Sequence, residues 1–118
     1  MNPPIATAVR GGDYVFLSGI PPAENNAVVA KGDIAKQVDF VLEEMAVILA
    51  KEGLSLSNLV YVQVYLRSMD GIKELNQCYA EKMPKPYPAR KVITTEFTLE
   101  GVCVEISGIA YAGKKKTA

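Results

Sequence analysis

The stretch "NLVYVQVYLRS" (residues 58–68) alternates strictly between two kinds of side chain. Alternate residues of a β-strand point to opposite faces, so this spacing predicts a strand with two different surfaces. The aliphatic face consists of Val60, Val62, Val64 and Leu66. The other face consists of Tyr61, Gln63, Tyr65 and Arg67. The first face is suited to packing against a helix, and the second to a wetter environment.

The segment before this strand predicts the helix that covers it. Asp33 is a plausible N-cap and Gly53 a plausible stop. Between them, apolar residues recur at the spacing of one helix face. They are Ile34, Val38, Val41, Leu42, Met45, Ile48 and Leu49.

The remaining elements follow from shorter signals. "DYVFLSGI" (13–20) reads as a strand entered through the turn at Gly11–Gly12, and "PPAENNA" (21–27) as a loop. "GIKELNQCYAEKM" (71–83) predicts a second helix that ends before "PKPYP". Its buried side is expected to hold Ile72, Leu75, Tyr79 and Met83. Two further strands are expected at about 89–97 and 102–111.

The order β–β–α–β–α–β–β predicts an α+β fold with two helices packed on one face of a mixed β-sheet. We expect a single domain over residues 1–118. The other sheet face would then show apolar and aromatic side chains to water. The residues concerned are Phe16, Tyr61, Tyr65, Ile109 and Tyr111. An oligomer that packs sheet faces together would cover them and create clefts between subunits. A monomer with an aromatic surface is the alternative.

Composition limits the chemistry. The 118 residues carry 13 basic and 13 acidic side chains and no histidine, so histidine-dependent nucleophilic and metal chemistry is excluded. Cys78 and Cys103 are isolated and are expected to be reduced packing residues. We expect no cofactor or metal, no nucleic-acid partner, no membrane span and a cytoplasmic location. The end of the chain, 114–118, is expected to be a flexible basic tail.

Two charged residues lie within expected strands. Arg90 shares a strand face with the apolar Val92, and Glu105 lies in the middle of "VCVEISGIA" (102–110). An unpaired buried carboxylate is costly, so Glu105 needs a partner or a function. Arg90 on a neighbouring strand could be that partner. A structural ion pair and a catalytic site both remain open from the residues alone.

Four motifs in order resemble a known family. They are "FLSG" (16–19), the N-x-x-Y pattern at 76–79, "YPAR" (87–90) and "VEISGIA" (104–110). Together they are similar to the RidA/YjgF reactive-intermediate deaminases. The resemblance implies a chorismate-mutase-like fold, a homotrimer whose sheets form a central barrel, and sites in the clefts between subunits.

The implied chemistry is hydrolysis of enamine and imine intermediates such as 2-aminoacrylate to a 2-keto acid and ammonia, without a cofactor. By the resemblance, Arg90 would bind the substrate carboxylate and Glu105 would activate water. Ser18, Gly19 and Asn76 match positions beside the substrate.

The chain also departs from the family pattern. Ile5 stands where many members have a tyrosine, Val92 where many have a cysteine at the site, and Ile20 where "SGQ" is usual. These changes bear on the identity of the small carboxylate or imine substrate. A different small amine or acid is one alternative. An endoribonuclease that inhibits translation and a non-catalytic, chaperone-like ligand-binding trimer are the others.

Overall fold

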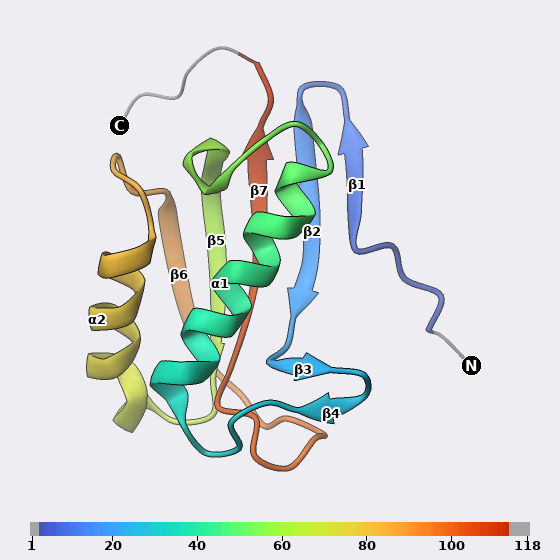
Figure 1. The fold of residues 1–118 in the computed structure, drawn as a ribbon. Coiled ribbons are helices and arrows are strands. Elements are labelled where there is room, and N and C mark those ends of the chain that lie inside the picture. The colour runs from blue at the N-terminus through green and yellow to red at the C-terminus, as the bar shows by residue number, and fades with distance from the viewer. Residues whose placement is uncertain (1–2, 114–118) are drawn as a thin grey trace.

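In the computed structural model, which describes residues 3–113, two helices lie against one face of a mixed sheet (Figure 1). The sheet has five strands in the order β1-β2-β7-β5-β6. The strands are β1 (Ala8–Gly11), β2 (Tyr14–Ile20), β5 (Leu59–Leu66), β6 (Ala89–Thr94) and β7 (Val104–Tyr111). The helices are α1 (Ile34–Ala50) and α2 (Ile72–Lys82). Strand β6 runs parallel to β5, and the other pairs are antiparallel. The expected fold class is confirmed, and so is the order of the two helices and of the strands in the main sheet.

Helix α1 begins and ends where the sequence predicts. The side chain of Asp33 accepts a hydrogen bond from the Lys36 amide at 3.1 Å, which satisfies one of the free donors of the first turn. After the helix, Gly53 has a φ of 75°, a conformation that costs glycine little. The residues of α1 that are fully buried against the sheet are Gln37, Val38, Val41, Leu42, Met45 and Leu49. Truncating a leucine such as Leu42 to alanine in such a core costs about 2–5 kcal/mol.

Strand β5 differs from its expected faces at one end. Val62, Val64 and Leu66 are fully buried under the helices, as expected. At the start of the strand, Leu59 is fully buried, whereas Val60 is only partly buried. The pairing with β7 shifts register between Leu59 and Tyr61, and such an irregularity interrupts the simple alternation.

The segment expected to be a loop at 21–27 contains two short strands, which corrects that prediction. Strands β3 (Ala23–Glu24) and β4 (Ala27–Val28) pair as an antiparallel ribbon beside the main sheet (Figure 1). Asn25 and Asn26 connect them with φ angles of 52° and 66°. Two consecutive positive φ angles are those of a type I′ turn, which asparagine tolerates and which favours a tight hairpin.

Gln37 connects α1 to the segment that leads into β7. It is fully buried, and its Nε2 donates to the carbonyls of Val29 (3.1 Å), Ala30 (3.1 Å) and Gly101 (2.8 Å). Its Oε1 accepts a hydrogen bond from the Cys103 amide at 2.7 Å. One buried amide therefore contacts four backbone groups, and two of them, the Val29 carbonyl and the Cys103 amide, have no other partner among residues 3–113.

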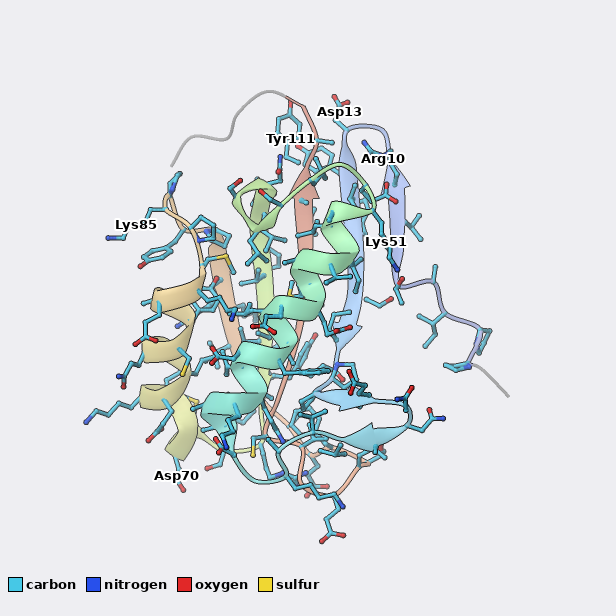
Figure 2. The ribbon with its side chains drawn as sticks, viewed as in Figure 1. Arg10, Asp13, Lys51, Asp70, Lys85 and Tyr111 are labelled. Atoms are coloured by element: carbon cyan, nitrogen blue, oxygen red, sulfur yellow. The ribbon has the colours of Figure 1, made fainter. Side chains whose placement is uncertain are left out.

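The sheet face opposite the helices is open, as expected. Tyr14 and Phe16 are 44% and 47% exposed, and the rings of Tyr14 and Tyr111 lie 5.2 Å apart. Figure 2 shows Arg10 at the same end of the sheet as Tyr111. Arg10 pairs with Glu52 just after α1, with 3.3 Å between Nε and Oε1. Among residues 3–113, neither helix has the length and apolarity needed to cross a membrane. The tail expected at 114–118 lies outside the described residues.

Candidate functional site

Arg90 lies on the sheet's edge strand, beside α2. In the parallel ladder it pairs with Val62, whose side chain is buried under the helices, so Arg90 points to the helix side. Its Nη2 donates to Oδ1 of Asn76 at 2.7 Å. Its Cζ lies 4.9 Å from the centroid of the Tyr79 ring. The guanidinium is exposed, and its remaining donors have no partner within residues 3–113. This leaves them available to an anion.

Tyr79 forms the buried side of this arrangement. Only 5% of the residue is exposed, and its hydroxyl is buried with no hydrogen-bond partner in the described part of the chain. Burial raises the pKa of Tyr79 to about 12, although the nearby charge of Arg90 opposes the shift. The phenol is therefore neutral at physiological pH and presents its ring face to the guanidinium.

Glu105 lies on the other face of the sheet. It pairs with Tyr65 in the antiparallel ladder, and its neighbours Val104 and Ile106 are fully buried on the helix side. Glu105 itself is half-buried, and burial raises the pKa of its carboxyl above the ordinary value of 4.5. Within residues 3–113 the carboxylate has no ion-pair or hydrogen-bond partner. A carboxylate in this state is suited to accept a proton.

Ser18 and Gly19 form an irregularity in β2 next to this carboxylate. The pairing of β2 with β7 shifts register between Leu17 and Ile20. The hydroxyl of Ser18 donates to the Ala6 carbonyl at 2.6 Å, and this contact holds the N-terminal segment against the strand. A Cβ on Gly19 would lie 2.5 Å from Oε2 of Glu105. The absence of a side chain at residue 19 therefore leaves the room that Glu105 occupies.

Ser18 and Gly19 also line a cavity of about 380 Å³. Its wall is mostly apolar and includes Ile5 and Ile20, two of the positions where the chain departs from the family pattern. Ile5 is 66% exposed. Val92, the third such position, is partly buried against the core and pairs with Val64. The side chain of Val92 therefore contributes to packing on the helix side.

The ion pair considered between Arg90 and Glu105 does not form within residues 3–113, and the interpretation that the two residues lie on neighbouring strands was wrong. Strand β5 lies between β6 and β7, so the two residues are not on neighbouring strands. They also point to opposite faces of the sheet. The structure thus brings together Arg90 with Asn76, and Glu105 with Gly19 and the adjacent Ser18, as two separate groups.

Tyr79 in the site, and Gln37 in the support of the segment before β7, were not singled out from the sequence. Tyr79 was expected only to be buried on α2, although it closes the N-x-x-Y motif and lies one turn after Asn76. Gln37 was not singled out at all. Its signal is a polar residue within the apolar stripe of α1, three residues after Ile34. In the described part of the chain, no group of three or more His, Cys, Asp and Glu residues is arranged to hold a metal ion.

Comparisons with known proteins place this geometry in a family. The family model described as Endoribonuclease L-PSP matches residues 3–112. A RutC family protein of Pyrococcus horikoshii is 35% identical over 109 residues, which cover 92% of this chain and 86% of that protein. The 3-aminoacrylate deaminase RutC of Acinetobacter baylyi is also 35% identical over 109 residues, with the same coverage.

Comparison with solved structures points to the same family. The crystal structure of RidA from an Antarctic Psychrobacter species superposes with a TM-score of 0.84 at 27% identity, covering 92% of this chain and 89% of that one. The resemblance drawn from the four sequence motifs is confirmed. The chain belongs to the Endoribonuclease L-PSP family, which is the RidA/YjgF family.

Proposed function

We propose that the protein is a hydrolytic deaminase of reactive enamine and imine intermediates of the 2-aminoacrylate type. Its products would be a 2-keto acid and ammonia. Family membership supports this proposal, as does the 35% identity to a 3-aminoacrylate deaminase. An imine carbon next to a carboxylate is already electrophilic, so a bound carboxylate, a base and a water suffice for its hydrolysis.

The observation that carries the proposal is the separation of Arg90 from Glu105. Their side chains lie on opposite faces of one sheet, with β5 between their strands. A substrate of a few carbon atoms cannot touch both groups of one chain. A site that uses both therefore needs a second copy, with Arg90 and Asn76 from one subunit and Glu105, Ser18 and Gly19 from its neighbour. A homotrimer with three such clefts satisfies this requirement.

In this site Arg90 binds the substrate carboxylate through donors that Asn76 leaves free. A guanidinium presents its N–H groups as a planar fork that matches two carboxylate oxygens. The carboxylate is attached to the imine carbon, so binding it also fixes the reacting atom. The backbone at Ser18–Gly19 of one subunit borders the bound substrate. Val92, on strand β6 of the other subunit with Arg90, borders it as well.

Glu105 acts as the general base. It removes a proton from water as the water oxygen bonds to the imine carbon, and the C=N electron pair moves to nitrogen, which takes up a proton. The hydroxyl proton of the carbinolamine then passes to its nitrogen by way of Glu105, so the C–N bond breaks with release of ammonia as the C=O bond forms. The sum is one imine and one water converted to one keto acid and one ammonia. Burial raises the pKa of the Glu105 carboxyl, and a higher pKa makes its carboxylate a stronger base.

The test is ammonia release from 2-aminoacrylate that a second enzyme generates in the assay. We expect the protein to accelerate release over the spontaneous rate, and Glu105→Gln to reduce kcat about 10²–10⁴-fold. Glu100→Gln is the matched control, because Glu100 is an exposed acid in the segment before β7, and it should keep the full rate. A rate equal to that of buffer alone would refute the proposed activity. An unchanged rate for Glu105→Gln would refute its role as base.

A further inference from the structure

Arg90 is a long, flexible side chain on an exposed edge strand, yet it is held at two points by one helix. Asn76 and Tyr79 are three residues apart in α2 and share a face of it. Asn76 accepts a hydrogen bond from Nη2 at 2.7 Å, and the Tyr79 ring lies 4.9 Å from Cζ. The first contact holds one nitrogen, and the second holds the guanidinium carbon over the face of the ring.

The burial of Tyr79 makes it the rigid member of this pair. The residue is 5% exposed, so its ring has little freedom to move, whereas Asn76 is exposed. A cation over the face of an aromatic ring is attracted by the ring's quadrupole, and the attraction grows when water is excluded from one side. The ring therefore limits the orientations that Arg90 can adopt.

The Tyr79 hydroxyl takes no part in this contact. It is buried and has no hydrogen-bond partner within residues 3–113. A buried hydroxyl without a partner lowers stability. Ring and hydroxyl can therefore be tested separately, because Tyr79→Phe removes only the group that makes no contact with Arg90.

We propose that Tyr79 is a positioning residue for substrate binding, whose ring holds the Arg90 guanidinium ready for a carboxylate. The proposal rests on the proposed function, in which Arg90 binds the substrate carboxylate. A guanidinium that is already oriented loses less conformational freedom when the ligand binds. Tyr79 thus raises the affinity for carboxylate ligands without touching them.

The first test measures pyruvate affinity by calorimetry, with circular dichroism as a check of folding. Tyr79→Leu removes the ring and should weaken pyruvate binding about 3- to 30-fold. Tyr79→Phe should bind pyruvate within about twofold of the wild type and melt at a higher temperature. Should Tyr79→Leu fail to fold, Tyr79→Met replaces it, since methionine is flexible and fills irregular space. Equal pyruvate affinity in the wild type and the non-aromatic variant would overturn the proposal.

Tyr87 provides a matched control from the same cluster. Its ring centroid lies 6.4 Å from that of Tyr79, and its ring lies 5.8 Å from Lys85 Nζ. It is 43% exposed, and the cation stacked on Tyr79 is Arg90. Tyr87→Leu should therefore leave pyruvate affinity unchanged. A loss as large as that of Tyr79→Leu would mean that packing of the cluster, and not the contact with Arg90, sets the affinity, which would overturn the proposal.

A double-mutant cycle with Arg90→Lys shows whether Tyr79 acts through Arg90. Lysine keeps the charge but lacks the planar fork, so Arg90→Lys alone should weaken pyruvate binding about 30-fold or more. In that background Tyr79→Leu should add less than twofold. Additive losses would overturn the positioning role and leave the function of Arg90 standing. No loss from Arg90→Lys alone would refute the proposed function of Arg90, and the role of Tyr79 would fall with it.

The changes in KM and kcat distinguish a role in positioning Arg90 from a general loss of activity. For imine hydrolysis, Tyr79→Leu should raise KM, with kcat reduced by less than the rise in KM, because the Glu105 machinery stays intact. A fall in kcat with unchanged KM would contradict a role exerted through substrate binding.

Discussion

Gly19 lies against the carboxylate of Glu105, so closely that a Cβ at residue 19 would come within 2.5 Å of Oε2. Such a contact is shorter than packed atoms allow, so any side chain at residue 19 must move the carboxylate. The atoms in the way are the far end of a flexible side chain, and Gly19 does not have a positive φ. The relationship therefore bears on the position of Glu105 more than on folding.

Gly19→Ala tests this relationship. We expect the melting temperature to change by only a few degrees and turnover of 2-aminoacrylate to fall about 10- to 100-fold, because a displaced base no longer aligns the water. Gly11→Ala is the control, since a Cβ there would meet only Phe16 at an ordinary 3.4 Å, and it should keep normal turnover. Normal turnover in Gly19→Ala would show that the position of the carboxylate is not critical.

The raised pKa of Glu105 has a consequence for stability. Below pH 4.5 the carboxyl is protonated in both the folded and unfolded chain, so its burial carries no charge penalty. As pH rises through 4.5 and then through the higher pKa of the folded state, the folded chain must accept a partly buried charge and loses stability. Glu105→Gln has no charge to bury, so it should be more stable than the wild type at pH 7.5. The difference should shrink towards zero below pH 4.5.

Urea unfolding at pH 4 and pH 7.5, at fixed protein concentration, measures this difference. Glu100→Gln, at an exposed position, should show no such dependence on pH. A wild type that is more stable than Glu105→Gln at pH 7.5 would mean that the carboxylate has a charge-stabilising partner in the assembled protein.

Arg90 and Glu105 show how far the sequence could predict the site. Helical periodicity and capping predicted α1 almost to its ends, because Asp33 and Gly53 act through local geometry. The positions of Arg90 and Glu105 on strands were also predicted. Their relation was not, because spacing along the chain does not show which strands pair. Strands β6 and β7 follow one another in sequence, yet β5 lies between them.

Two local signals were present but were not used. Asn25–Asn26 is a pair that favours a type I′ turn, and it connects the ribbon that was expected to be a loop. At the start of β5, Leu59 is buried in place of Val60. This difference depends on the pairing of β5 with β7, so no local pattern predicts it. The contact of Tyr79 with Arg90 likewise depends on α2 packing beside the edge strand.

Gln37 supports the strand that carries Glu105, and its removal should be costly. Gln37→Leu would leave the Val29 carbonyl and the Cys103 amide without partners among residues 3–113. The Ala30 and Gly101 carbonyls would each lose one of their partners. We therefore expect a loss of about 2 kcal/mol or more in the free energy of unfolding. Gln77→Leu, at an exposed position of α2, should change it by about 0.5 kcal/mol or less. Denaturant unfolding compares the two. Equal stabilities would mean that water replaces the lost contacts.

The last prediction concerns the open face of the sheet. There Gln63 donates from Nε2 to the Tyr61 hydroxyl at 3.2 Å and accepts from the Tyr65 hydroxyl at 2.8 Å. These three side chains form a hydrogen-bonded row. Two of them, Tyr61 and Gln63, line a hollow of about 190 Å³ on that face together with Phe16 and Ile109. A row with its polar groups already paired can be covered by another protein surface at little cost.

If sheets of three copies meet on this face, light scattering should give a mass three times the 12.8 kDa of one chain. Tyr65→Asp or Gln63→Glu should then shift the mass towards that of the monomer, because each would bury an unpaired charge. Val47→Asp is the control: Val47 is 52% exposed on α1, on the opposite side of the sheet, and the same kind of charge there should leave the mass unchanged. The ammonia-release rate should fall together with the mass, since each site would need groups from two chains. A wild-type mass of 12.8 kDa at micromolar concentration would refute both the trimer and the shared site.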